Sequence, residues 1–272
     1  MEQELVSVIM PTFNTGEYLS DSIECVLQQS HRNLELLITD DASTEELTKE
    51  ILNRYAARDA RVKIVELESN HGPSYARNNA IKRAQGRYIA FCDSDDLWMP
   101  EKLERQIACM EEHDSALCYT SYTICNEQGN TIGVVKAPKY ITFDQLKMDN
   151  KVGCSTAIYD TKRLGRKYYM PNLLKRQDWG LFLSILRDSH VGYGIQIPMA
   201  IYRQRADSVS SGKLGLVKYN LRVYTKVLGF SVLKAYFYFV FCFMPCYTLK
   251  VLKKKWDSWR YVSTHGNDVA EG

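Results

Sequence analysis

The sequence lacks the short cysteine and histidine spacings that are typical of zinc sites and disulfide frameworks. Its eight cysteines form no CxxC pair, and its five histidines form no HxxxH pair. Neither a structural zinc ion nor a small disulfide-stabilised scaffold is expected, because both depend on such spacings. Several cysteines lie within apolar runs, as Cys92 does in Tyr88–Cys92. We therefore expect buried, reduced thiols and a cytosolic protein.

Three further features are missing. No GxGxxG motif follows an early apolar run, which argues against a dinucleotide-binding dehydrogenase. No uninterrupted apolar run reaches the ~18–20 residues that a bilayer-spanning helix needs. The first residues are acidic rather than basic, so no signal peptide is expected. The 272 residues are enough for one large globular domain, or a domain with an appendage.

What the first ~120 residues do contain is a regular alternation of strand and helix patterns. Four apolar, strand-like runs follow one another at spacings of 25 to 29 residues: Leu5–Met10, Leu34–Thr39, Val62–Leu67 and Tyr88–Cys92. Apolar residues at helical spacing fill the intervals and a fourth helix follows: Leu19–Leu27, Leu47–Tyr55, Ala76–Ala84 and Leu103–Met110. Ser43 and Glu46 predict a capping box at the start of the second helix. The spacing is that of βαβ units and predicts an α/β fold with a mostly parallel sheet covered on both faces.

The next part of the chain is less regular. Ala116–Ser121 predicts a fifth strand, Asn126–Asn130 a hairpin turn, and residues 131–160 short strands. An amphipathic helix is expected over Trp179–Arg187 and a strand over Val191–Arg203.

Polar residues cluster where the early strands are predicted to end. In open α/β sheets, ligands bind at the carboxyl ends of the strands, where the loops gather. The clusters are Thr12-Phe13-Asn14, Asp40-Asp41, Asn70-His71-Gly72-Pro73 and Asp93-Ser94-Asp95-Asp96. Any one of these groups could simply be a turn or a helix cap. Carboxylates gathered from two strands would repel one another unless a cation compensates, and carboxylate with phosphate oxygens suits Mg²⁺ or Mn²⁺.

Five segments, taken in order, resemble the inverting glycosyltransferases of family 2, which have the GT-A fold. They are VSVIMPTFN, ITDDAS, NHGPSYARNNAI, GRYIAFCDSDDLW and QDWGLFL. The resemblance covers about residues 4–211. It implies a GT-A domain over residues 1–212, with a nucleotide-binding part to about residue 121 and an acceptor-binding part to residue 212. A helical tail over residues 213–272 follows it.

The resemblance also implies roles for single residues. Thr12 and Phe13 resemble residues that frame the nucleotide base, and Asp41 resembles the carboxylate that accepts a base N–H. Asp93 and Asp95 match the family's DxD motif, with Asp93 towards the ribose and Asp95 on a Mg²⁺ or Mn²⁺ ion. The expected nucleotide-sugar site comprises Pro11, Thr12, Phe13, Asn14, Asp41, Asn70, Arg77, Asp93, Ser94 and Arg205; the expected metal ligands are Asp95 and Asp93. Asp178 matches the catalytic base.

Two positions depart from the family pattern. The usual Glu-Asp pair is Gln177-Asp178 here, and the usual histidine of a later Tyr-Arg-x-His motif is Arg205. Arginine cannot ligate a metal, although it can hold a phosphate. These departures keep open a second hypothesis, a catalytically silent sugar-nucleotide-binding protein. A phosphatase with an aspartyl nucleophile is disfavoured, because no second acid–base pair accompanies the DSDD segment.

Basic and aromatic residues gather near the end of the chain. Residues 213–260 hold ten Lys or Arg and one acidic residue, Asp257, a local charge of +9. Subtracting +9 from the net charge of +3 leaves −6 for the rest of the chain. Because the basic stretch adjoins the aromatic run Ala235–Tyr247, it favours a membrane surface over nucleic acid as the partner. We predict a helix in the headgroup layer, with Trp256 and Trp259 at the interface.

The alternatives for this tail are a core helix or a homodimer interface. With the resemblance, the tail predicts a cytoplasmic enzyme, peripheral to the inner face of the cell membrane. The expected reaction moves a sugar from a nucleotide-sugar donor, a UDP-sugar, to a hydroxyl of a lipid-linked glycan in cell-surface polysaccharide synthesis. No nucleic-acid partner is expected.

Overall fold

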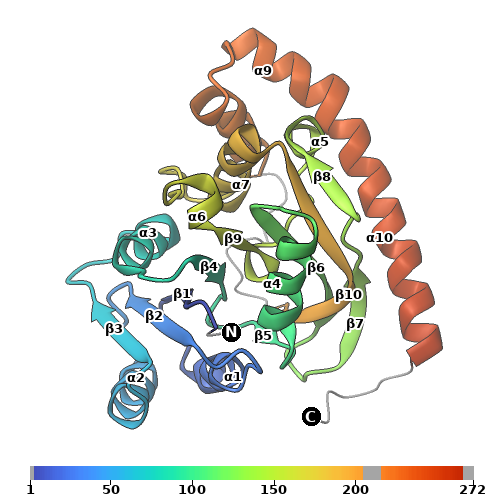
Figure 1. Cartoon of the computed structure of the whole chain (residues 1–272). Coiled ribbons are helices and arrows are strands. Elements are labelled where there is room, and N and C mark those ends of the chain that lie inside the picture. Colours follow the sequence, from blue (N-terminus) through green and yellow to red (C-terminus); the bar gives the residue numbers. More distant parts are fainter. Residues whose placement is uncertain (1–2, 205–215, 266–272) are drawn as a thin grey trace.

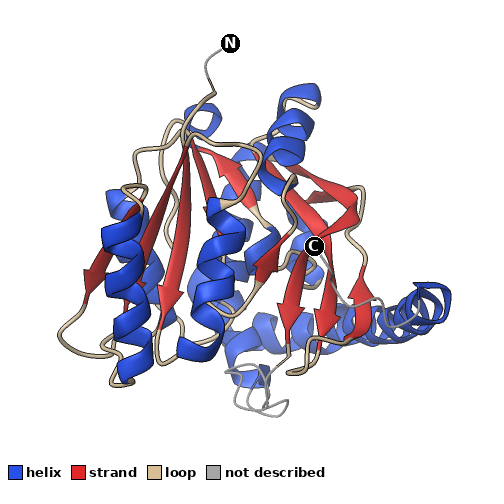
Figure 2. Cartoon of the chain, turned by 90° about the horizontal axis from the view of Figure 1, so that it is seen from below, coloured by secondary structure: helices blue, strands red, loops and turns tan. Residues whose placement is uncertain are grey.

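The first half of the chain forms a parallel sheet, as predicted. The computed structural model describes residues 3–204 and 216–265. Four strands pair in parallel in the order β3-β2-β1-β4. They are β1 (Val6–Thr12), β2 (Leu34–Asp40), β3 (Val62–Glu66) and β4 (Tyr88–Phe91). Figure 2 shows them running away from the end of the molecule at which the N-terminus lies.

The helices of this half cover both faces of the sheet (Figure 1). They are α1 (Gly16–Leu27), α2 (Glu46–Arg58), α3 (Pro73–Arg83) and α4 (Lys102–Glu112). Alternate residues of β1 point to opposite faces: Val8 joins the core under α1 and α2, and Ile9 joins the core under α3. Burial on both faces explains why these strands are continuous apolar runs.

The second half extends the same sheet with mixed pairing. Its strands are β5 (Leu97–Trp98), β6 (Leu117–Cys125), β7 (Thr131–Val135), β8 (Tyr140–Thr142), β9 (Ile158–Asp160) and β10 (Val191–Arg203). The sheet continues from β4 through β9, β6 and β10 to β5, and β9 runs antiparallel to both of its neighbours. The predicted hairpin turn Asn126–Asn130 joins β6 to β7. Helical elements lie between the strands: α5 (Phe143–Met148), η1 (Cys154–Thr156), α6 (Thr161–Leu164) and α7 (Gln177–Ser189).

The described part of the predicted tail, residues 216–265, is helical and rests on the second half of the sheet (Figure 1). Its elements are α8 (Leu216–Arg222), η2 (Val223–Val227), α9 (Val232–Tyr238), η3 (Phe239–Phe243) and α10 (Met244–His265). The helix Val232–Thr264 is long and apolar enough, by length and composition, to cross a membrane. Its apolar stretch is interrupted by polar residues, which is why the sequence contains no long uninterrupted run.

One side of this tail is built into the domain. Phe243 packs on the buried Trp179 of α7, with ring centroids 5.8 Å apart. Ser258 Oγ accepts a hydrogen bond from Val134 N at 3.0 Å in β7. A side chain at Gly133 would collide with Ser258, because its Cβ would lie 2.6 Å from that Oγ. Gly133 therefore allows α10 to approach β7 closely.

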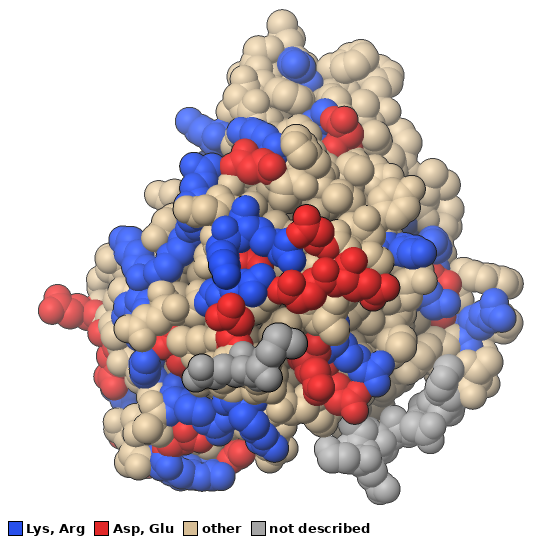
Figure 3. All heavy atoms as spheres, viewed as in Figure 1, with Lys and Arg blue, Asp and Glu red and all other residues tan. Residues whose placement is uncertain are grey.

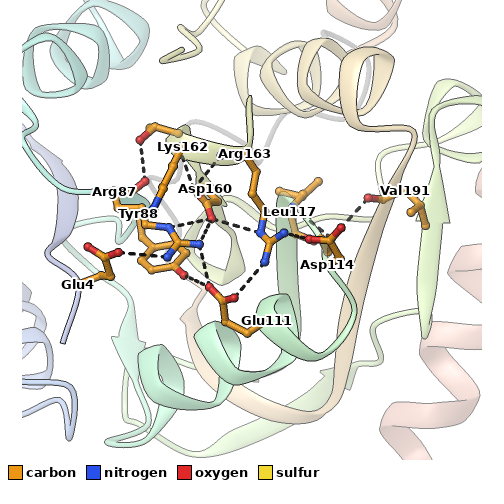
Figure 4. Close-up of polar contacts among 12 residues, drawn as sticks. Glu4, Arg87, Tyr88, Glu111, Asp114, Leu117, Asp160, Lys162, Arg163 and Val191 are labelled. Carbon is orange, nitrogen blue, oxygen red and sulfur yellow. Dashed lines mark hydrogen bonds and ion pairs between the residues drawn. The ribbon is translucent and has the colours of Figure 1, made fainter. Parts of the chain in front are cut away.

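A network of ion pairs closes the amino end of β4 (Figure 4). Asp160, fully buried at the end of β9, accepts hydrogen bonds from Arg87 Nε at 3.0 Å and Nη2 at 2.7 Å. Glu111 of α4 lies between Arg87 and Arg163, at 2.8 and 3.0 Å. Figure 3 shows basic and acidic side chains interspersed on this face. The network joins β4, β9, α4 and α6 at the edge opposite to the candidate site.

Candidate active site

The predicted polar clusters come together at the carboxyl edge of the sheet. Thr12 lies opposite Asp40 in the β1–β2 register, and β1 also pairs in parallel with β4. A chain of hydroxyl groups then joins β1 to the segment after β4. Thr12 Oγ1 lies 2.6 Å from Thr15 Oγ1, which lies 3.0 Å from Ser94 Oγ. The structure therefore brings Thr12 and Ser94 into one site, as expected.

Asn14 ties the loop after β1 to the start of α2. Its Oδ1 accepts hydrogen bonds from Thr44 N at 2.9 Å and Glu45 N at 3.0 Å. The predicted capping box of Ser43 and Glu46 is wrong. The N-cap of α2 is Glu45, and its side chain accepts no hydrogen bond from the backbone of the first turn. Ser43 Oγ instead accepts from Asn14 N at 2.9 Å. The loop after β2 is thus fixed by a residue from another strand end.

Asp41 holds the loop that leads into α3. Its two carboxylate oxygens accept hydrogen bonds from His71 N at 2.8 Å and Gly72 N at 2.7 Å. Gly72 has φ 86°, a left-handed conformation that favours glycine. Asn70, in the same loop, is exposed. Asp41 therefore stabilises this loop, and its contact with a nucleotide base stays a prediction.

The other expected base-site residues surround these loops. Pro11 is half-buried and Phe13 is 45% exposed, unlike most aromatic residues of the sheet. An exposed ring beside the strand ends offers a face for stacking. Arg205 lies outside the described residues.

Arg77 and Asp93 form the centre of the site. Arg77, buried in α3, donates from Nη2 to Asp93 Oδ1 at 2.5 Å. Its Nε and Nη1 are buried and have no hydrogen-bond partner. Burial opposes the charge, but Asp93, with smaller contributions from Cys154 and Asp178, outweighs it and raises the pKa of Arg77 above its ordinary value. Buried N–H donors are rarely left unpaired, so this guanidinium indicates a site for an oxygen-rich ligand.

The carboxylate that follows the DxD motif is internal. Asp96 is buried, and it accepts hydrogen bonds from Ser155 Oγ at 2.5 Å and Arg203 N at 3.2 Å. Burial, with Asp95 and Asp93 nearby, raises the pKa of Asp96 well above its usual range. Ser155 Oγ also accepts from Asp93 N at 3.0 Å. Asp96 and Ser155 thus shape the DxD loop from beneath.

Asp95 is the expected ligand of a divalent cation. Among the described residues, no three His, Cys, Asp or Glu side chains could hold a metal alone. Asp93 is engaged by Arg77, and Asp95 is half-buried at the site. Mg²⁺ in nucleotide sites is commonly held by one or two carboxylates together with substrate phosphates and waters. The residues present fit such an ion only when a diphosphate completes its ligands.

Asp178 faces the same site from α7. The N-cap of α7 is Arg176, so Asp178 lies in the first turn and not at the N-cap. Its Oδ2 accepts a hydrogen bond from Asn150 Nδ2 at 3.1 Å. Its charge contributes to the raised pKa of Arg77, so the two side chains lie within electrostatic range of each other. The neighbouring Gln177 is buried, and its Oε1 has no hydrogen-bond partner.

Sequence reasoning missed Ser155 and Asn150. Ser155 bridges the DxD loop, and Asn150 holds Asp178. Both belong to the irregular segment between α5 and β9, where no periodic pattern places a side chain. Small polar residues of this kind resemble ordinary loop residues in a single sequence.

Comparison with known proteins gives a consistent result. The model of the family described as glycosyl transferase family 2 matches residues 7–171. The chain is 39% identical over 252 residues to TuaG of Bacillus subtilis, whose name assigns it to teichuronic acid biosynthesis. That match covers 92% of this chain and 97% of the relative.

A second relative, WfgD of Escherichia coli, is 36% identical over 219 residues. The match covers 80% of this chain and 84% of the relative. WfgD is named as a β-1,3-glucosyltransferase that uses UDP-Glc and α-D-GlcNAc-diphosphoundecaprenol.

Solved structures show the same fold. Residues 1–349 of TarS from S. aureus, in complex with UDP-GlcNAc, superpose with a TM-score of 0.66 at 21% identity, covering 85% of this chain and 69% of that one. A mannosyltransferase from Pyrobaculum calidifontis, in complex with GDP-Man and Mn²⁺, gives a TM-score of 0.59 at 16% identity, covering 85% of this chain and 66% of that one. The GT-A fold expected from the sequence is confirmed.

Proposed function

The chain belongs to glycosyl transferase family 2, and from this premise we propose that it transfers a sugar from a UDP-sugar to a lipid-linked glycan, with inversion at the anomeric carbon. The family makes it a glycosyltransferase. The donor and acceptor classes are supported by WfgD, named for UDP-Glc and a diphosphoundecaprenol-linked sugar, and a role in cell-surface polysaccharide synthesis is supported by TuaG.

The observation that carries the proposal is the guanidinium of Arg77, which has two buried N–H groups without partners beside Asp93. A diphosphate oxygen would satisfy such donors and would gain strength from the positive charge. Phe13 and the loop held by Asp41 lie at neighbouring strand ends, so they would enclose the base. A divalent cation held by Asp95 would supply neutralisation of the charge that develops on the leaving diphosphate.

Asp178 is the proposed general base. The acceptor hydroxyl loses its proton as its oxygen attacks the anomeric carbon, so a carboxylate must lie within hydrogen-bond reach of it. Attack from the side opposite to the diphosphate inverts the anomeric centre. Asn150 Nδ2, at 3.1 Å, holds one Asp178 oxygen and leaves the other to accept the proton.

The tail supports a position at the membrane surface. Its outward side carries exposed apolar residues at helical spacing, on either side of the exposed Thr248: Leu233, Phe237, Phe241, Leu252, Trp256 and Trp259. Exposed lysines at 253–255 lie beside the two tryptophans, as in interfacial helices. The inward side packs on β7 and α7, so crossing the bilayer would require the helix to leave the domain.

We therefore propose that the tail lies on the inner face of the cell membrane and that the enzyme works in the cytoplasm. Binding to anionic vesicles should weaken as salt rises, because the lysines act through a screened surface potential. Retention that does not respond to salt would indicate insertion. A concentration-dependent dimer without vesicle binding would indicate a homodimer interface.

A catalytically silent sugar-nucleotide-binding protein is the second candidate. Gln177, which is neutral where the family usually has glutamate, favours it. Asp178→Asn separates the two, because an amide cannot take the acceptor proton. Turnover should fall on the order of 10²–10⁴-fold, with UDP affinity and melting temperature nearly unchanged.

The matched control is Asp188→Asn, a carboxylate near the other end of the same helix that pairs with Arg166. It should leave transfer within a few fold of the wild type. Equal turnover of Asp178→Asn and wild type would remove the catalytic assignment. No transfer by the wild type with any UDP-sugar, despite tight UDP binding, would favour the silent binder.

A further inference from the structure

The tail helix reaches the segment that holds the proposed base. Lys250, in the middle of α10, donates from Nζ to Asp149 Oδ1 at 2.6 Å and to the carbonyl oxygen of Asn150 at 2.8 Å. Asp149 is almost completely buried, and its Oδ2 has no hydrogen-bond partner. A buried carboxylate depends strongly on its paired cation, so this contact fixes residues 149 and 150 to the helix.

Asn150 continues the connection into the site. Its Oδ1 accepts a hydrogen bond from Val152 N at 3.2 Å, which orients the amide. Its Nδ2 then donates to Asp178 Oδ2 at 3.1 Å. Lys250 of α10 is therefore connected to Asp178 of α7 through Asn150, whose backbone carbonyl accepts from Lys250 and whose side-chain amide donates to Asp178.

Contacts along α10 keep Lys250 in register. On one side of Lys250, Cys246 Sγ lies 4.0 Å from Met148 Sδ. Beyond it, Asp257 pairs with Lys136 at 3.5 Å, and Ser258 bonds to β7. Burial lowers the pKa of Lys250, while Asp149 opposes that effect. The helix is thus docked on both sides of the contact and cannot shift without moving Asn150.

We infer that Lys250 and Asn150 are positioning residues for sugar transfer, through which the tail helix orients the carboxylate of Asp178. The inference rests on the proposed function, because it takes Asp178 as the base. It gives the tail a role in turnover that is separate from membrane binding. A base displaced by about 1 Å can cost on the order of 10²-fold in rate.

Asn150→Asp tests the amide donor. The substitution keeps an oxygen that can accept from Val152 N, so a purely structural role of Asn150 would survive it. It removes the N–H that reaches Asp178 and puts a like charge there. We expect kcat to fall at least about 10-fold, with an unchanged KM for the UDP-sugar and an unchanged UDP affinity. Transfer would be measured with the UDP-sugar that the wild type uses and GlcNAc-diphosphoundecaprenol as the acceptor.

Lys250→Met tests the link from the helix, and Lys63→Met is its matched control. Lys63 also pairs with a buried carboxylate, Glu35, at 2.7 Å, but it lies on β3 and is connected to neither α10 nor Asp178. Both variants should lose stability to a similar extent. Lys250→Met alone should lower kcat about 10-fold or more, and Lys250→Arg, which can still donate to both acceptors, should recover most of it.

If Lys250→Met does not fold, the double variant Asp149→Asn with Lys250→Met removes the unpaired buried charge and keeps the test. A full kcat in this variant or in Asn150→Asp, while Asp178→Asn is inactive, would overturn the inference and leave the proposed function standing. An active Asp178→Asn would overturn both. Equal losses of kcat in Lys250→Met and Lys63→Met would also overturn the inference, because they would reduce the effect to general destabilisation.

Discussion

The two edges of the parallel sheet hold their charges in opposite ways. At the amino edge, the buried Asp160 accepts hydrogen bonds from Arg87 and from the backbone N–H groups of Lys162 and Arg163 (Figure 4). At the carboxyl edge, the three carboxylates Asp93, Asp95 and Asp96 lie near one another, and Arg77, which pairs with Asp93, keeps two donors without partners. Each edge contains an ion pair with one buried partner: Asp160 lies 2.7 Å from Arg87 at the amino edge, and Arg77 lies 2.5 Å from Asp93 at the carboxyl edge.

The difference separates a structural network from a binding site. Where cations and hydrogen-bond donors already compensate a carboxylate, the fold needs no ligand there. Even Arg163 Nε, which makes no hydrogen bond at the amino edge, lies 3.4 Å from Asp160 Oδ2. Where an arginine keeps two buried nitrogens without partners beside clustered carboxylates, a ligand that brings both phosphate oxygens and a metal satisfies both. Function is therefore assigned to the edge whose charges the protein does not balance alone.

The largest expected effect concerns the metal at the carboxyl edge. Chelation of divalent ions should abolish transfer and weaken UDP binding, because a cation held by Asp95 would also bind the diphosphate. Asp95→Asn should reproduce the loss, on the order of 10²-fold or more in turnover, at saturating UDP-sugar. Coupled assays of UDP release with and without added Mn²⁺ measure both effects. Equal turnover in excess chelator would instead make arginine side chains the neutralising groups.

The next effect is a stability change at the amino edge. Arg87→Met removes the main partner of the fully buried Asp160 and should lower the free energy of unfolding by about 3 kcal/mol. UDP affinity should stay the same, since Arg87 lies at the opposite end of β4. Urea denaturation and calorimetry on the same variant check both statements. A weakened UDP affinity would mean that Arg87 at the amino edge also affects nucleotide binding at the carboxyl edge, which contradicts the separation of the two.

Asp41→Ala should have a smaller effect. If Asp41 accepts the uracil N3–H, its removal weakens UDP binding by ~1.5–3 kcal/mol. The His71 and Gly72 N–H groups also lose their acceptor, so part of the loss would come from a looser loop. Comparing UDP with CDP, which lacks the N3–H, separates these contributions in calorimetry. The same loss of affinity for both nucleotides would mean that Asp41 acts only by holding the loop.

The smallest expected effect lies between the edges, at Lys102. Burial lowers its pKa to about 7, against an ordinary value of 10.5, and its Nζ lies 3.7 Å from the centroid of the Trp98 ring. Between these two pKa values the folded state binds fewer protons than the unfolded state, so stability rises with pH in that window. Lys102→Met should gain about 1 kcal/mol at pH 6. The gain should fade by pH 10, as thermal denaturation at both pH values would record.

Much of the fold could be predicted because the early strands are buried on both faces. Continuous apolar runs marked them, and Val191–Arg203 was predicted with the bounds that β10 has. The position of β9 could not be predicted. Ile158–Asp160 is short and pairs with residues about 40 and 70 positions away, so no local pattern marks its place between β4 and β6. The docking of α10 was hidden for the same reason, since it depends on contacts such as Gly133 with Ser258.

The site residues at the strand ends could be predicted from the sequence, whereas the residues that hold them in place could not. Thr12 ends β1, Asp93 and Ser94 follow β4, and Arg77 lies within α3, so the α/β pattern brings them together. Ser155 stands in an irregular segment, and its contact with the DxD loop depends on how that segment folds back. Sequence patterns locate side chains along regular elements, whereas these contacts require three-dimensional packing.

The most direct test of the central claim is the UDP affinity of Arg77→Met beside that of Arg87→Met, measured by calorimetry with Mn²⁺ present. Both variants remove an arginine that pairs with a carboxylate near β4, one from each edge. Arg77→Met should weaken UDP binding at least about 10-fold, through the loss of a charge-assisted contact, and Arg87→Met should leave the affinity unchanged. Unaltered UDP binding by Arg77→Met would contradict the assignment of the carboxyl edge as the nucleotide site.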